Sequence, residues 1–180
     1  MEKQNSLTSK PKRPDVSILG FNGNNQNMST AVFNSAKADA NTKVRVGVAI
    51  VIRDGQGKIL LERRSDCGLW GLPGGRIDPG ESISETVIRE ALEETGLVVE
   101  ITCLLGVYSD PEDRIVSYSD GVVQLVDIML EARVLSGQMH LSEESLELKF
   151  FAPDELPFDI VPPAKLPIQD AARRSVGTIR

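Results

Sequence analysis

The chain has 180 residues, of which 41% are hydrophobic and 26% charged, which is typical of one soluble globular domain and excludes disorder throughout. Its net charge of −6 argues against a protein that binds nucleic-acid polymers nonspecifically, but it leaves small phosphorylated ligands open. Because its apolar runs fall short of the roughly 18 residues that span a bilayer and its polar start does not resemble a secretory signal, we predict a cytoplasmic protein without membrane contact.

Residues 1–43 differ from the rest of the chain because they are rich in Asn, Ser, Lys and Gln and poor in apolar residues. Such a segment buries too little apolar surface to fold alone. We therefore predict a mobile or docked N-terminal arm, followed by a single domain at 44–180. Two short apolar pieces, at 16–19 and 31–33, could add as strands to a sheet edge or to a partner subunit, so a homodimer is one option.

The predicted domain opens with a hairpin. A β-branched run at 44–52 is followed by the turn dipeptide Asp54-Gly55, and residues 58–63 have the pattern of the returning strand. A glycine-rich loop over 68–80 then leads toward a helix.

Helix signals bracket the next segment on both sides. Ser82 is a good N-cap, and Glu85 three residues later completes a capping box. Gly96 stands where a left-handed C-terminal cap belongs. These signals predict a helix at about 83–95.

The remaining elements alternate between apolar runs and polar connections. Strands are predicted at 97–108 and 122–134, with a polar stretch at 109–121 between them, and a shorter strand is predicted at 146–152. Residues 164–174 have the composition of a short closing helix. Strands mixed with one central and one terminal helix predict an α+β fold or an α/β/α sandwich.

The predicted helix separates its carboxylates from its apolar side chains. At 100° per residue, Glu90, Glu93 and Glu94 fall within an arc of roughly 100°. The adjacent arc is apolar, and we expect it to pack against the sheet. Its members are Val87, Ile88, Ala91 and Leu92.

Three carboxylates on one helix face have two interpretations. On an exposed helix, like charges one turn apart cost only a few tenths of a kcal/mol, so a solvated acidic face is one of them. In a cleft of effective dielectric near 20, two carboxylates about 6 Å apart repel by roughly 3 kcal/mol, which a divalent cation would remove. Hard oxygen ligands favour Mg²⁺, for which Mn²⁺ can substitute. The helix alone leaves both readings open.

The flanking residues favour a phosphate and metal site. Gly74 and Gly75 let the backbone come close to a ligand. The guanidinium groups of Arg76 and Arg89 can pair with phosphates or hold carboxylates in place. Arg89 has an alternative role as the partner of Glu85 in an ion pair on the helix surface.

This segment resembles the Nudix box, a family motif with seven fixed identities. All seven are present, and a chance match at one start is on the order of 10⁻⁸. The resemblance extends over about 44–160, including the lead-in at 70–75 and the closing strand and turn at 144–157. The seven matching residues are Gly75, Glu81, Arg89, Glu90, Glu93, Glu94 and Gly96.

The resemblance implies a Nudix-type α/β/α sandwich with a mixed sheet and a catalytic helix at about 83–95. It implies that Arg89 and Glu81 brace the site, and that an acid outside the box binds metal or removes a proton. Glu144 is our choice for that acid, with Glu143 and Glu147 next. The metal ligands that the resemblance implies are Glu90, Glu93, Glu94 and the carbonyl of Gly74.

The implied activity is Mg²⁺-dependent hydrolysis of the phosphoanhydride bond in a nucleoside diphosphate linked to another moiety. ADP-ribose is the first choice, while dinucleotides, nucleotide sugars and oxidised triphosphates stay open. The alternatives are a Nudix-fold nucleotide sensor without turnover and a structural protein with a solvated acidic helix. We expect Arg76, Arg64 and Tyr108 to contact the substrate, although for Arg64 a solvated surface charge is the favoured alternative. Tyr108 or Trp70 could stack on a base, but plain packing explains either ring equally well.

Overall fold

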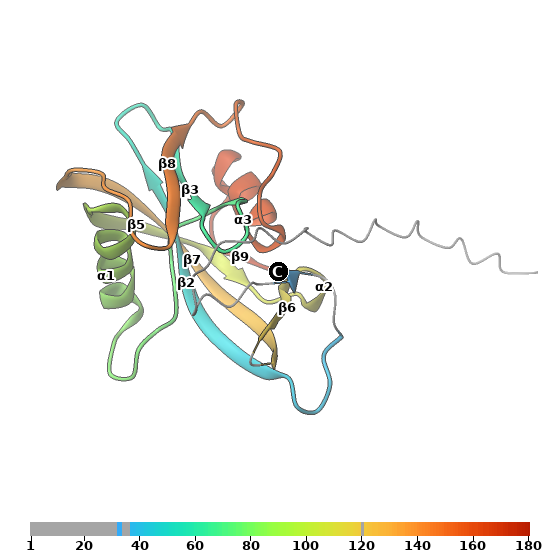
Figure 1. The fold of residues 1–180 in the computed structure, drawn as a ribbon. Coiled ribbons are helices and arrows are strands. Elements are labelled where there is room, and N and C mark those ends of the chain that lie inside the picture. Colours follow the sequence, from blue (N-terminus) through green and yellow to red (C-terminus); the bar gives the residue numbers. More distant parts are fainter. Residues whose placement is uncertain (1–31, 34–36, 120) are drawn as a thin grey trace, which may run out of the picture.

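The structure, a computed structural model, describes residues 32–33, 37–119 and 121–180 (Figure 1). Its helices are α1 (Ile83–Thr95), α2 (Pro111–Arg114) and α3 (Pro162–Ala172). Its strands are β1 (Val32–Phe33), β2 (Lys43–Arg53), β3 (Ile59–Arg64), β4 (Trp70–Gly71), β5 (Leu97–Tyr108), β6 (Ile115–Tyr118), β7 (Gly121–Gly137), β8 (Ser145–Phe151) and β9 (Thr178–Ile179). In this part of the chain the strands form one mixed sheet, with neighbours in the order β1-β6-β7-β2-β3-β4. Strand β5 pairs with β7 and β9, and β8 pairs with β3.

Strands β2 and β7 form the centre of the sheet and pair in parallel over the whole length of β2. Because side chains alternate between the two faces of a strand, β2 supplies two separate cores. Val51 packs in the cluster that contains Ile168 of α3, whereas Ile50 and Ile52 pack in the cluster that contains Val87 of α1. Figure 1 shows α1 and α3 on opposite sides of these strands. The predicted α+β sandwich with a mixed sheet is confirmed.

Helix α1 begins and ends where its capping signals predict. The Ser82 hydroxyl accepts a hydrogen bond from the Glu85 amide, and the Glu85 carboxylate accepts one from the Ser82 amide at 2.8 Å. Gly96 adopts the left-handed conformation at φ 74° and donates its N–H to the carbonyl of Leu92. The predicted bounds of 83–95 are therefore confirmed.

The buried face of α1 differs from the predicted one. Ala91 is fully buried, but Ile88 and Leu92 are 46% and 48% exposed, so the prediction that these two pack on the sheet is wrong. At about 100° per residue they lie roughly 60° to 100° beyond Ala91, outside the arc that meets the sheet. Glu90 and Glu94 lie inside that arc and are buried instead. Two of the three carboxylates predicted to bind metal thus lie against the protein rather than in bulk solvent.

Other boundaries shift by a few residues. The strand predicted at 122–134 extends to Gly137 as part of β7, and α3 begins at Pro162 because proline suits the first turn of a helix. The polar stretch at 109–121 was predicted as a connection, but it contains α2 and β6.

The N-terminal prediction falls mostly outside the described residues, since 1–31 and 34–36 are not among them. Within the second apolar piece, Val32 and Phe33 pair with β6 in antiparallel orientation. The piece at 16–19 lies outside the described part. None of the helices that the structure describes has the length and apolar character needed to cross a membrane.

Candidate active site

Arg89 connects the acidic side chains of the Nudix-box segment. Its guanidinium donates to Glu81 through two bonds of 2.7 and 2.9 Å, to Glu90 at 2.9 Å and to Glu93 at 3.1 Å. This arrangement differs from the alternative pairing with Glu85, whose carboxylate caps the helix instead. Arg89 lowers the pKa of Glu81 to about 2, so Glu81 stays ionised. The predicted bracing role of this pair fits the observed contacts.

The glycine loop before α1 lies directly against its buried carboxylates. The amide of Gly74 donates to Glu94 Oε2 at 2.7 Å. A Cβ added to Gly75 would lie only 2.3 Å from Glu90 Oε1, and one added to Gly74 would lie 2.3 Å from the Val48 carbonyl. A side chain at Gly74 would meet backbone atoms and one at Gly75 would displace the Glu90 carboxylate, so both glycines let the loop lie against these two carboxylates.

The buried carboxylates of this region share a crowded negative environment. Burial raises the pKa of Glu94 and of Glu90 above the ordinary value of 4.5, and the charge of Glu144 raises both further. Glu62 on β3 is a neighbour that the sequence analysis missed, and burial raises its pKa as well. Its carboxylate accepts a hydrogen bond from the Ser145 hydroxyl at 2.7 Å. Glu144, the predicted outside acid, thus lies within electrostatic reach of α1.

The segment that carries Glu144 is fastened to two elements. The carbonyl of Glu144 accepts bonds from the amide and the hydroxyl of Ser65, both at 2.8 Å. At its other end, the amide of His140 donates to the Thr95 carbonyl at 3.1 Å. A Cβ on Gly96 would lie 2.5 Å from the Gln138 carbonyl, so this segment packs tightly on the end of α1. Glu143 and Glu147 are exposed, and neither lines the cavity described next.

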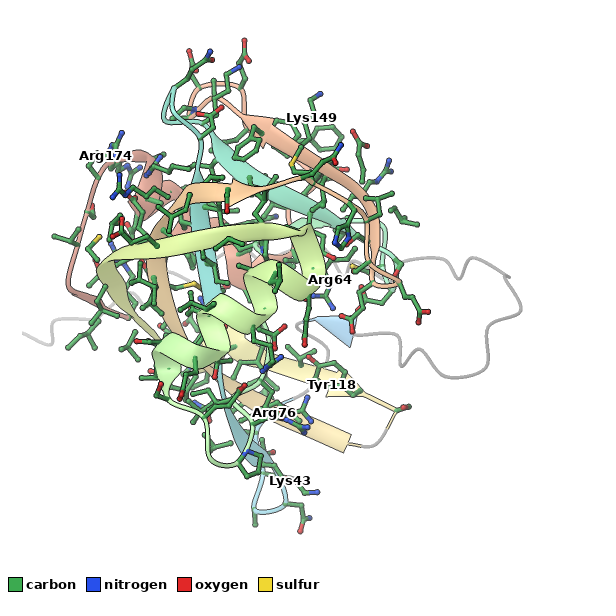
Figure 2. The ribbon with its side chains drawn as sticks, turned by 90° about the vertical axis from the view of Figure 1, so that its left-hand side faces the viewer. Lys43, Arg64, Arg76, Tyr118, Lys149 and Arg174 are labelled. Atoms are coloured by element: carbon green, nitrogen blue, oxygen red, sulfur yellow. The ribbon has the colours of Figure 1, made fainter. Side chains whose placement is uncertain are left out.

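A cavity of about 260 Å³ opens beside the glycine loop. Its floor is one face of the β2 and β7 pair, and its far wall is the start of α3. Figure 2 shows Arg64, Arg76 and Tyr118, which all line it, on the same side of the molecule beside α1. The polar or charged lining residues are Arg45, Arg64, Arg76, Arg114, Tyr118, Asp127 and Glu144.

Of the three residues predicted to contact the substrate, two line the cavity and Tyr108 does not. Arg64 and Arg76 line the cavity; Arg64 also forms two bonds with Asp66, at 3.0 and 2.8 Å. Tyr108 is not among the lining residues of this cavity, because it is buried and donates its hydroxyl to Asp170 at 3.0 Å. Trp70 is buried too, and it packs edge-on against Phe151.

Two residue pairs in the cavity escaped the sequence analysis. Arg114 is 2% exposed and donates to Asp127 Oδ2 at 2.6 Å. The guanidinium of Arg45 lies 5.1 Å from the centre of the Tyr118 ring. The one available signal was Asp127 itself, a carboxylate with apolar neighbours on both sides, at 125–126 and 128–130.

The chemistry of the α1 carboxylates fits a hard divalent cation. Glu90 and Glu94 are buried beside like charges, so a cation would stabilise their ionised forms. Over the described ranges, no group of three or more Asp, Glu, His or Cys side chains is arranged as a ready-made metal site. Glu93 is turned toward Arg89, but it is 59% exposed and can rotate toward the other two carboxylates.

Comparison with known proteins gives matches over the same region. The family model for the NUDIX domain matches residues 43–174. A Bacillus subtilis protein named "Putative 8-oxo-dGTP diphosphatase" is 36% identical over 69% of this chain and 77% of its own length. An ADP-ribose pyrophosphatase of Methanocaldococcus jannaschii is 38% identical over 56% of this chain and 57% of its own length.

Solved structures give the same result at the level of the fold. The crystal structure of an ADP-ribose pyrophosphatase from Streptococcus suis superposes with a TM-score of 0.57 at 26% identity, covering 76% of this chain and 97% of that one. A MutT NUDIX hydrolase from Burkholderia pseudomallei gives 0.61 at 30% identity, covering 71% and 98%. Since the family match spans most of the chain and includes the helix and glycine loop described above, the chain belongs to the Nudix hydrolase family.

Proposed function

We propose that this enzyme uses Mg²⁺ to hydrolyse the phosphoanhydride bond of a nucleoside diphosphate linked to another moiety, with ADP-ribose as the first candidate. One observation carries the proposal. The cavity begins at Gly74 and Gly75, whose other side touches Glu90 and Glu94, and it includes Glu144. A substrate lodged there would bring its phosphates to the edge of the glycine loop, next to the acidic helix.

The donor set assigns roles to the residues around α1. Glu90, Glu93 and Glu94, with the carbonyl of Gly74, would hold the cation. When bound, Mg²⁺ supplies charge neutralisation on the diphosphate. Arg89 and Glu81 keep the carboxylates on one face of the site. Arg76, whose side chain is 66% exposed at the cavity mouth, is placed to contact a phosphate.

Hydrolysis itself requires a water molecule and a base. The water oxygen forms a bond to one phosphorus while the bridging P–O bond breaks, and the bridging oxygen leaves with the other phosphate. Glu144 or Glu90 accepts the proton that the water loses. Glu144 lines the cavity, and Glu90 lies against Gly75 at the cavity edge.

The candidate substrates differ among the relatives. Two of the similar proteins are named ADP-ribose pyrophosphatases, which supports ADP-ribose, and one is named for 8-oxo-dGTP, which makes an oxidised triphosphate the second candidate. A sensor that binds the nucleotide without turnover is the remaining alternative. The cytoplasmic location and the homodimer stay predictions from the sequence.

A substrate panel tests the proposal. ADP-ribose, 8-oxo-dGTP, dinucleotides and nucleotide sugars are incubated with Mg²⁺ in ¹⁸O-labelled water, and mass spectrometry identifies the phosphate that gains the label. Glu93→Gln should lower kcat by about 10²–10³-fold while nucleotide binding persists. Glu155→Gln, in an exposed turn, is the matched control and should keep full activity. Nucleotide binding by the unmodified protein without turnover on any compound would favour the sensor.

A further inference from the structure

The cavity floor has an unusual composition for a binding surface. Alternate residues of β2 and β7 point to it, namely Arg45, Gly47, Ala49, Leu125, Asp127 and Met129. Arg45 and Asp127 are charged, whereas the other residues of the floor are apolar or, at Gly47, lack a side chain. Asp127 therefore places a single carboxylate in the middle of a mainly apolar surface.

Asp127 is held in a fixed orientation. Its Oδ2 atom accepts the 2.6 Å bond from Arg114, which is 2% exposed and lies with its guanidinium 5.4 Å from the ring centre of Tyr108. Its Oδ1 atom lies on the side of Gly47, 3.7 Å from the position that a Cβ of Gly47 would take. Asp127 and Gly47 both line the cavity, and since Arg114 takes Oδ2, Oδ1 is the carboxylate oxygen left to face it.

The glycine loop connects this carboxylate to the catalytic end. Gly47 is the register partner of Asp127 on β7 and forms a bridge with Arg76 on its other side. The Gly75 carbonyl would lie 2.8 Å from a Cβ of Gly47. Asp127 therefore lies one strand away from the loop that contacts Glu90.

The remaining shape suits a flat ring with polar edges. The cavity of about 260 Å³ is below the roughly 300–1,000 Å³ of pockets that enclose a whole drug-sized ligand, so its size suits one part of a nucleotide. Leu125 and Met129 are apolar, and Tyr118 offers an aromatic ring at the wall. A nucleobase matches this combination of apolar faces and one hydrogen-bond acceptor.

We propose that Asp127, fixed by Arg114, selects nucleotides whose base carries an exocyclic amino group, which donates a hydrogen bond to Oδ1. This inference rests on the proposed function, because it assigns the cavity to the base of the same substrate. Adenine and guanine carry such a group. Hypoxanthine and xanthine carry a carbonyl at the corresponding position, and that oxygen would face the carboxylate without a proton between them.

Exchanging the carboxylate for an amide reverses the expected preference. In Asp127→Asn, the amide oxygen accepts the bond from Arg114, so the amide NH₂ faces the cavity. The unmodified protein should bind AMP at least about tenfold more tightly than IMP, or GMP more tightly than XMP, and Asp127→Asn should prefer IMP or XMP. Calorimetric titration without added metal measures these ratios, and kcat/KM for ADP-ribose and its inosine analogue repeats them under turnover.

Two further variants keep the test decisive. Asp154→Asn makes the same exchange in an exposed turn and should leave every ratio unchanged. If Asp127→Asn does not fold, Arg114→Met combined with Asp127→Leu removes both charges and should bring the ratios close to one.

The outcomes separate this inference from the proposed function. An amino preference in binding without turnover on any substrate would remove the hydrolase proposal and keep this one. Turnover without an amino preference, or a preference that survives the exchange at Asp127, would overturn this inference alone. It would also be overturned if none of the four monophosphates bound.

Discussion

The site has two ends, the carboxylates of α1 with Arg89 (the α1 end) and the Arg114 and Asp127 pair in the cavity (the cavity end). Different kinds of ion pair hold the two ends. At the α1 end, Arg89 divides its guanidinium among Glu81, Glu90 and Glu93, and the Glu93 side chain is 59% exposed. At the cavity end, the side chains of Arg114 and Asp127 are only 3% and 16% exposed and share a bond of 2.6 Å.

This difference matters because the same kind of charge pair has different energetics in the two places. Exposed ion pairs contribute about 0–1 kcal/mol and exchange readily with water or a cation. A buried pair that loses one partner costs about 3–5 kcal/mol, since the other charge is left uncompensated. The α1 end can therefore rearrange when ligands change, while the cavity end acts as a fixed template for recognition.

Replacing each arginine in turn tests most directly whether the two ion pairs differ in energy. Arg114→Met should lower the free energy of unfolding by about 3–5 kcal/mol, because Asp127 stays buried without a partner. Arg89→Met should lower it by less than this, because the Arg89 side chain is 27% exposed and two of its three carboxylate partners, Glu81 and Glu93, can turn to solvent. Urea denaturation followed by circular dichroism measures both values. Adding Asp127→Leu to Arg114→Met should restore most of the loss, and equal losses for the two single variants would contradict the comparison.

Moving one carboxylate at the α1 end should affect turnover more than stability. The new methyl group of Gly75→Ala would lie 2.3 Å from Glu90 Oε1, which is the far end of a flexible side chain and can move away. A shift of roughly 1 Å in a catalytic group costs about 10²-fold in kcat. Steady-state kinetics and a melting curve on the same sample test this prediction.

Gly55→Ala provides the control for that substitution, because a Cβ at Gly55 has no neighbour within 4 Å. It should keep both kcat and Tm. Unchanged turnover in Gly75→Ala would show that the observed position of Glu90 is unimportant for the reaction.

The smallest expected effect concerns pH. Burial raises the pKa of Glu94 above its ordinary value of 4.5, so the folded protein binds more protons than the unfolded chain at higher pH. Protonated Glu94 stabilises the fold fully when the pH is below the ordinary pKa of a glutamate. This stabilisation is lost as the pH rises toward the raised pKa of Glu94. The Tm of the metal-free protein should therefore fall across a series from about pH 5 to about pH 9.

Two comparisons sharpen the pH series. Glu94→Gln cannot titrate at this position and should show a shallower fall. Mg²⁺ favours the ionised carboxylates, so it should reduce the fall in the unmodified protein. A Tm that rises over this range without metal would contradict the assigned direction of the pKa shift.

The α1 end was predictable because its signals lie close together in the sequence. The capping box at Ser82, the left-handed Gly96 and the spacing of the glutamates all act within one helix and its caps. The same local reasoning placed Ile88 and Leu92 on the wrong side, because the width of the contact with the sheet depends on the neighbouring strands.

The cavity end could not be predicted in this way. Asp127 meets Gly47 only because β7 lies parallel to β2 in one particular register, and Arg114 comes from a stretch without a strong pattern. The positions of Tyr108 and Tyr118 likewise depend on the tertiary fold. Both follow or end apolar runs, but only the fold determines that Tyr118 lines the cavity while Tyr108 is buried against Asp170.

The segment from Gln138 to Glu144 is tied to the end of α1 on one side and to Ser65 on the other. The position of Glu144 is thereby set by the number of residues between these two attachment points. An extra residue there would have to bulge outward or carry the acid out of place. Relatives that use an acid at this position should accordingly conserve the length of the segment from 138 to 144.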